Sequence, residues 1–202
     1  MSSSKGTYGL PHYKNSRAAM QNYEPVYNNL FTVEIQLPAA ATGGAEVAYS
    51  TNLLLENVQK ISGLNTHKMP GTVEQKYKYA SRRYAGARPD NTYIDITLDF
   101  EVNLSNENDD QPSPYVLKTL RRWCDLVYDP LTGKTGLKKD YIAPWVLVTM
   151  YDRGDRPFWQ WKLYSVFPTT AINYPELDYN SQDIYRIQGF TLACDYWDES
   201  IV

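Results

Sequence analysis

The fold is decided by the stretch Tyr93-Ile-Asp-Ile-Thr-Leu-Asp-Phe-Glu-Val-Asn103, in which apolar and polar side chains alternate without a break. Side chains of a β-strand point alternately to opposite faces of a sheet. The pattern therefore predicts a strand with one face in the core and one face in water. The apolar face consists of Ile94, Ile96, Leu98, Phe100 and Val102, and the polar face of Asp95, Thr97, Asp99 and Glu101.

Shorter runs of the same kind predict a protein that is mainly β. In residues 29–37, Phe31, Val33, Ile35 and Leu37 alternate with polar residues. Further strands are predicted at residues 53–61, 72–79, 144–151, 158–167 and 185–197. Residues 1–28 are rich in Ser, Gly, Asn and Tyr and lack periodicity, so we expect an N-terminal arm. Residues 29–202 show no internal repeat and no boundary, which predicts a single domain.

One helix is predicted, at residues 113–128. Ser113 is a candidate N-cap, and Pro114 follows at the first helical position, where proline is well tolerated. The helix has an apolar stripe at spacings of four, three and four residues, formed by Val116, Leu120, Trp123 and Val127. The stripe predicts packing against the outside of the sheet, with Lys118, Arg121 and Arg122 on the opposite side of the helix.

Composition excludes several classes of protein. The chain has 202 residues, 43% of them apolar and 21% charged, and its net charge is −3, which is typical of a folded domain. It contains no apolar run of about 18 residues, so we expect no membrane association. Two cysteines 70 positions apart form neither a disulfide scaffold nor a zinc site. The 18 tyrosines suit half-buried sheet surfaces and large interfaces.

The motifs that suggest chemistry are incomplete, and we expect no enzyme, metal or cofactor. Residues 131–136 lack the first glycine of a phosphate-binding loop and follow a helix instead of a strand. Residues 106–117 resemble a calcium loop but lack its glycine and its final acid. His12 and His67 have no partner at metal-ligand spacing, and nothing in the sequence points to a catalytic triad.

Charge is segregated along the chain. Residues 60–88 carry seven cations and one acid, Glu74, whereas residues 89–117 carry seven acids and no cation. We therefore predict that the strand at residues 72–79 pairs with the strand at residues 93–103. The expected register places Glu74 opposite Asp99, Lys76 opposite Thr97 and Lys78 opposite Asp95, because a slip by one residue would bury a lysine.

This register predicts one shared wet face with a net charge of −2. Its members are Glu74, Lys76, Lys78, Asp95, Thr97, Asp99 and Glu101. The connection at residues 80–92 is longer than an ordinary hairpin loop, which favours a functional role. We predict that this connection reaches a neighbouring subunit through Arg82, Arg83 and Arg88.

Over residues 29–199 the chain resembles the tail tube proteins of contractile-tailed phages, which are related in fold to the inner-tube proteins of type VI secretion and other contractile injection systems. The matching pieces are the opening strand Asn29-Leu-Phe-Thr-Val-Glu-Ile, the strand at residues 95–103 before the single helix, the corner Phe167-Pro-Thr-Thr170 and the ending Phe190-Thr-Leu-Ala-Cys-Asp-Tyr-Trp197. The N-terminal arm, an insertion at residues 39–52 and a longer segment at residues 125–141 depart from the pattern.

The resemblance implies a β-sandwich or barrel flanked by one helix. It also implies hexameric rings that stack into a tube in the virion tail, assembled in the host cytoplasm, with a lumen that conducts DNA. The implied partners are the chain itself, the sheath, the baseplate, the tail terminator, the tape measure protein and, transiently, genomic DNA. The predicted wet face would line the channel. Its net negative charge would repel a polyanion and let DNA slide.

Two alternatives to a phage tail tube remain open. One is an inner-tube protein of a contractile injection system that carries protein effectors. The other is a monomeric β-sandwich module that binds carbohydrate through exposed Trp and Tyr, or single-stranded nucleic acid through Lys76, Lys78, Arg82 and Arg83.

Overall fold

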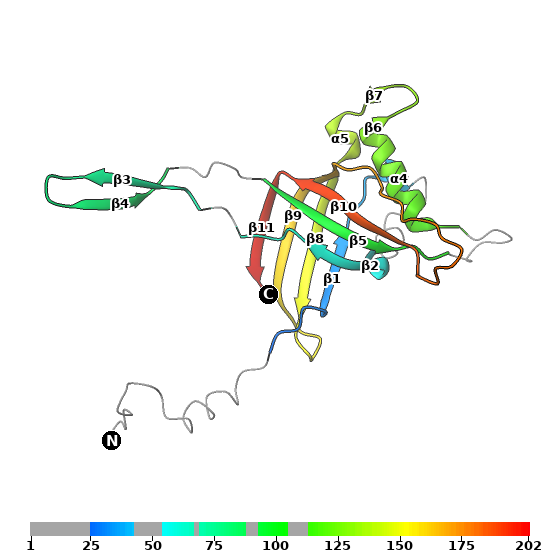
Figure 1. Cartoon of the computed structure of the whole chain (residues 1–202), viewed down its shortest axis with the longest axis horizontal. Coiled ribbons are helices and arrows are strands. Elements are labelled where there is room, and N and C mark those ends of the chain that lie inside the picture. Colours follow the sequence, from blue (N-terminus) through cyan, green and yellow to red (C-terminus); the bar gives the residue numbers. More distant parts are fainter. Residues whose placement is uncertain (1–24, 43–53, 67–68, 88–92, 105–112) are drawn as a thin grey trace, which may run out of the picture.

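The computed structural model describes residues 25–42, 54–66, 69–87, 93–104 and 113–202, which fold as strands around one long helix (Figure 1). The strands are β1 (Phe31–Ile35), β2 (Val58–Ser62), β3 (Thr72–Lys76), β4 (Ser81–Ala85), β5 (Ile94–Glu101), β6 (Tyr128–Asp129), β7 (Lys134–Thr135), β8 (Ala143–Tyr151), β9 (Pro157–Pro168), β10 (Arg186–Cys194) and β11 (Tyr196–Ile201). The helices are α2 (Ala39–Thr42), α4 (Tyr115–Val127) and α5 (Lys138–Tyr141), and residues 54–57 are also helical. None of the described helices could span a membrane.

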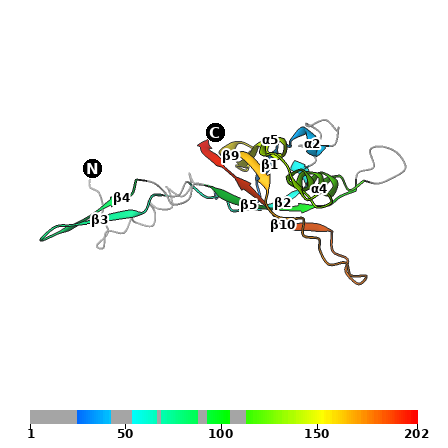
Figure 2. The same ribbon diagram turned by 90° about the horizontal axis from the view of Figure 1, so that it is seen from above.

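Seven strands form one sheet that folds over into two layers. The first layer contains β1, β8, β9 and β11, and the second contains β10, β5 and β2. β9 joins the two layers, because it pairs with β8 and β11 along most of its length and with β10 at Phe167 and Pro168. Figures 1 and 2 show the strands of the two layers crossing one another. Within the described residues the sheet has outer edges at β1, β2 and β11, so the sandwich is open and does not close into a barrel.

The corner between the layers is marked by Ser165. Its φ of +54° lies in the left-handed region, which costs an L-residue about 1–2 kcal/mol. Tyr164 pairs with β11, whereas Phe167 pairs with β10. The irregular backbone therefore lies where β9 exchanges one partner for the other, as expected where a strand turns from one layer into the next.

The alternation of β5 is confirmed. Ile94, Ile96, Leu98 and Phe100 are all buried, and the residues between them point to the other side of the sheet. Burial of Ile187, Phe190, Leu192 and Cys194 continues the apolar side across β10. The second layer therefore has one core face and one polar face. The prediction of a mainly β fold with a flanking helix is confirmed, whereas the arm at residues 1–24 lies outside the described residues.

α4 covers the apolar side of β10 and β5. Val116, Leu120 and Trp123 are buried as predicted, and Val127 is half-buried. The Trp123 ring lies 6.4 Å from the Phe190 ring, and its Nε1–H donates a hydrogen bond of 2.7 Å to the Tyr141 carbonyl. The predicted cap is wrong by one residue: Pro114 is the N-cap, and no side chain caps the helix.

Two predicted strands have different bounds. The strand expected at residues 53–61 begins only at Val58, because residues 54–57 are helical. The strand expected at residues 185–197 is two strands, β10 and β11, which separate at Asp195. β10 pairs with β5, whereas β11 pairs with β9, so the break at Asp195 lets the end of the chain return to the first layer.

The predicted pairing of residues 72–79 with residues 93–103 is wrong. β3 pairs with β4, which lies inside the segment expected to be a loop. Residues 77–80 close this hairpin, and Tyr77 N–H donates to the Ala80 carbonyl at 2.7 Å. The short closure costs about 1 kcal/mol less chain entropy than a 13-residue loop. β5, in turn, is already paired on both sides, with β2 and β10.

Candidate assembly surfaces

The outer side of β2, β5 and β10 is a continuous polar surface, which we call the polar face. Its rows follow the strand register, so Lys60 lies beside Asp99, Ser62 beside Thr97, and Thr97 beside Thr191. It consists of Lys60, Ser62, Asp95, Thr97, Asp99, Glu101, Arg186, Gln188 and Thr191. Alternation along three neighbouring strands brings these residues together, because the opposite side chains of the same strands fill the core.

Charges on the polar face are mixed and partly paired. Arg186 Nη2 lies 3.7 Å from Glu101 Oε2 across the β5–β10 pair. Asp99 Oδ1 accepts a 2.8 Å hydrogen bond from Gly189 N–H at the bulge of β10, where Gly189 has a φ of +73°. Two cations and three carboxylates leave the face with a net charge of −1. A face of this kind stays hydrated and holds no concentrated charge of either sign.

The predicted lumen residues separate into two groups. Asp95, Thr97, Asp99 and Glu101 share the polar face. Glu74, Lys76 and Lys78 do not belong to it, because they lie in or beside β3. Glu74 pairs with Arg83 and Lys76 with Ser81, so the predicted contacts with Asp99 and Thr97 are wrong.

The partners that β5 has in the structure, β2 and β10, bring Lys60 and Arg186 to the polar face. Sequence reasoning missed both residues. They lie within segments predicted as strands, and a correct strand order would have placed them there.

The β3–β4 hairpin projects away from the sandwich (Figures 1 and 2), and all ten residues of its two strands are exposed. Arg82 and Arg83 lie in β4, whereas Arg88 lies outside the described residues. A two-stranded hairpin with no covered face is at best marginally stable in water. Within the described residues, no other element covers either face of this hairpin.

The two faces of the hairpin differ. One face carries Val73, Gln75, Tyr77, Arg82 and Tyr84, and we call it the tyrosine face. The Tyr77 hydroxyl donates to Gln75 Oε1 at 2.8 Å, and a hydrogen bond with the Tyr84 side chain raises the pKa of Tyr77. The other face of the hairpin is polar and charged, with Glu74, Lys76 and Arg83.

The inner side of the first layer ends in an apolar row that the second layer leaves uncovered. The register places Phe31, Met150, Trp159 and Ile201 side by side across four strands. Ile201 is 80% exposed, and the other three are half-buried. The row borders an open hollow of about 710 Å³ between β1, β8 and β2. No described strand pairs with the outer edges of β1, β2 and β11, and an open strand edge invites pairing with another chain.

The described residues include two free cysteines, Cys124 and Cys194. They contain no group of three His, Cys, Asp or Glu side chains that could hold a metal ion. Burial, reinforced by Asp125, raises the pKa of the Cys124 thiol to about 11, and burial also raises the pKa of Cys194. Both thiols therefore stay protonated near neutral pH, and a protonated thiol is a poor nucleophile.

Three solved structures share this fold with TM-scores above 0.5. The chain is similar to a protein of the anti-feeding prophage cap, described as a tube-terminating cap, with 16% identity and a TM-score of 0.55 over 89% of this chain and 93% of that chain. It is also similar to a chain of the PVC sheath–tube complex in the extended state, an extracellular contractile injection system, with 16% identity and a TM-score of 0.55 over 92% of this chain and 97% of that one.

A third similar structure is the PVC sheath/tube terminator in the extended state, at 15% identity and a TM-score of 0.52, covering 89% of this chain and 99% of that one. The sequence itself matches no family model and no curated protein. At these identities the likeness establishes the fold. The tail-tube type of fold implied by the sequence resemblance is therefore confirmed.

Proposed function

We propose that this chain is a structural subunit of the inner tube of a contractile tail or injection machine, where it forms hexameric rings that stack. The observation that carries the proposal is the fold, which matches proteins of the cap and sheath–tube assemblies over nearly their whole length. The open sandwich agrees with it. Among the described residues, the outer strand edges have no strand partner and the apolar row is uncovered; both are liabilities in a monomer, and neighbouring copies in a ring would remove them.

The polar face is proposed to line the channel. A lumen wall must stay wet on one side while its other side packs a core, and the β2–β5–β10 layer has this property. With its mixed charges and net −1 per subunit, the wall would weakly repel a polyanion and would bind no cargo tightly. Asp95, Thr97, Asp99 and Glu101 therefore keep their proposed lumen role, and Lys60 and Arg186 join them.

The cargo divides the proposal into two candidates. In a phage tail the tube conducts genomic DNA into the host and contains a tape measure protein during assembly. In an injection system the tube carries protein effectors, and the extracellular injection machines among the similar structures favour this second candidate. The sheath, the baseplate and a terminator are the proposed partners in both cases.

The hairpin is proposed to reach a neighbouring subunit. Its exposure and its arginines, Arg82 and Arg83, support this role, and Arg88 belongs to the same proposal. A monomeric nucleic-acid module would use the same cations. Salt-dependent binding of single-stranded DNA by dispersed monomers would favour that reading instead.

Electron microscopy of the purified protein tests the proposal directly. Rings or tubes in negative stain, together with a hexamer or larger species in sedimentation, are expected at high protein concentration. Dispersed monomers at every concentration, and no ring in the assembled particle, would overturn it.

The direction of the polar face can be tested by labelling Thr97→Cys. The free subunit should react quickly with both a small maleimide and a maleimide attached to a bulky protein. In assembled tubes only the small reagent should react quickly. Lys118→Cys, on the exposed side of α4, is the matched control and should accept both reagents in monomer and tube. Equal labelling of Thr97→Cys by the bulky reagent in monomer and tube would contradict the lumen assignment.

A further inference from the structure

The tyrosine face of the β3–β4 hairpin has the composition of an interface. Val73, Tyr77 and Tyr84 are all exposed on it, with Arg82 among them. Tyrosine and arginine are the residue types that most often dominate binding energy. Residues 72–85 as a whole carry four cations against Glu74, a net charge of +3; Arg82 lies on the tyrosine face, whereas Lys76 and Arg83 lie on the other face of the hairpin. A partner for this surface must combine exposed apolar groups with negative charge.

The loop between β9 and β10 has these two properties. In residues 174–184 the charged side chains are Glu176, Asp178 and Asp183, all exposed, so the segment carries a net charge of −3. Leu177 is 83% exposed and Tyr179 fully exposed, and Ile184 is exposed as well. We call residues 174–184 the acidic loop.

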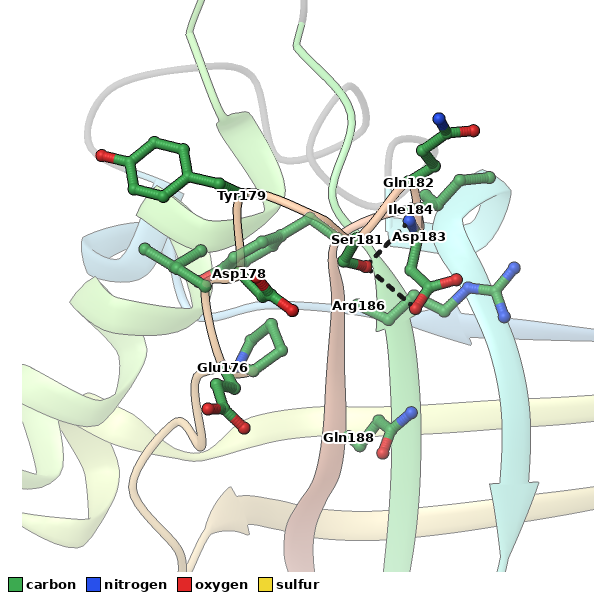
Figure 3. A pocket seen from close by; sticks show the side chains of 12 residues that line it. Glu176, Asp178, Tyr179, Ser181, Gln182, Asp183, Ile184, Arg186 and Gln188 are labelled. Carbon is green, nitrogen blue, oxygen red and sulfur yellow. Dashed lines mark hydrogen bonds between the residues drawn. The ribbon is translucent and has the colours of Figure 1, made fainter.

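The acidic loop surrounds an open hollow of about 830 Å³ (Figure 3). Asp178 turns toward this hollow, whereas the Tyr179 ring points away from it (Figure 3). Two hydrogen bonds within the loop stabilise its turns. Asn180 N–H donates to Asp178 Oδ1 at 3.0 Å, and the Ser181 hydroxyl donates to Asp183 Oδ2 at 3.0 Å. The loop therefore presents apolar side chains and carboxylates on a surface that already has a defined shape.

Within one chain, the hairpin and the acidic loop lie apart. The hairpin is attached at the start of β5, where Ile94 pairs with Cys194, and the loop leaves from its far end, where Glu101 pairs with Arg186. Eight residues of strand separate the two points, a distance of about 23 Å. The hairpin also projects away from the body on the side opposite the loop (Figures 1 and 2). The hairpin and the acidic loop of one chain therefore do not meet in the structure, and a second copy of the chain can supply the missing surface.

We propose that the tyrosine face of the hairpin of one subunit docks on the acidic loop of another subunit, with Arg82 meeting the carboxylates of Glu176, Asp178 and Asp183 and with the net positive charge of the whole hairpin favouring their approach. This inference rests on the proposed tube function and names the acceptor surface of the hairpin. The contact is heterologous, because it joins two different patches of the same chain, and such contacts build rings or stacks.

Variants that reverse the charge of the acidic loop, of the hairpin, or of both test the contact. The loop variant Glu176→Lys/Asp178→Asn/Asp183→Asn changes the loop from −3 to +1, and asparagine can preserve the turns. The hairpin variant Arg82→Glu/Arg83→Glu changes residues 72–85 from +3 to −1. Each variant alone should raise the protein concentration needed for tube formation about tenfold or more. The chain that carries both sets, and an equal mixture of the two single variants, should regain assembly.

Controls separate the possible failures. Asp125→Lys/Asp140→Lys removes two exposed carboxylates from α4 and α5 and should assemble like the wild type. Unchanged thermal melting of each variant subunit shows that folding is intact, and a Leu177→Cys/Tyr84→Cys chain should form a disulfide between copies.

If the wild type makes no rings or tubes, the proposed function itself fails. If the wild type and the loop variant assemble equally well, or if the double variant is no better than the singles, only the docking proposal is wrong.

Discussion

Trp123 is expected to be the side chain whose truncation most weakens the subunit. Its ring is fully buried between α4 and the second layer, and it contacts Phe190. Truncation of a buried Trp to Ala costs about 3–5 kcal/mol in lost transfer energy and cavity formation. The lost hydrogen bond to the Tyr141 carbonyl adds about 1 kcal/mol. Trp123→Ala should therefore lower the free energy of unfolding by about 4–6 kcal/mol.

The measurement is urea unfolding followed by far-UV circular dichroism, at concentrations where the protein is monomeric, because assembly would add its own stabilisation. Trp123→Phe keeps an aromatic ring and loses the hydrogen bond, so a loss of about 1–3 kcal/mol is expected. Tyr128→Ala, at the exposed residue that directly follows α4, should change stability by less than about 0.5 kcal/mol. A loss below about 1 kcal/mol for Trp123→Ala would refute the packing described for α4.

Two further perturbations probe the corner of β9 and the buried thiol. Ser165→Val should destabilise the subunit by about 1–2 kcal/mol, because a β-branched residue tolerates positive φ poorly, whereas Ser165→Gly should be neutral or stabilising in the same unfolding assay. The pKa of Cys124 is raised from 9.0 to about 11 in the folded chain. Between these pH values the unfolded chain loses the thiol proton first, so stability should fall as pH rises, and it should fall less steeply in Cys124→Ser. Equal slopes for the two proteins would contradict the raised pKa.

Local patterns predicted the elements of this fold well. The alternation of β5 identified both its buried residues and its polar residues, because a two-residue period is a property of a single strand. The stripe of α4 identified Val116, Leu120 and Trp123 as core for the same reason. These predictions required no knowledge of what lies next to each element.

Strand partnership could not be predicted in the same way. Segregated charge suggested that Lys78 pairs with Asp95, but charge complementarity between two segments does not say whether they belong to one chain or to two copies. Local hairpin closure at residues 77–80 decides the pairing of β3 in the structure. The predicted shared face was accordingly only partly right: Asp95, Thr97, Asp99 and Glu101 lie on one face, whereas Glu74, Lys76 and Lys78 lie in or beside β3. The positive φ of Ser165 has no signature in the sequence at all.

The hairpin and the acidic loop lie at opposite ends of β5, and this arrangement gives any assembly that joins them a direction. A stack built through such contacts shows hairpins at one terminus and loops at the other, so its two termini require different capping proteins. A nucleating complex that displays only one of the two surfaces would add subunits in one direction only. The length of the finished tube could then be controlled entirely at its growing end.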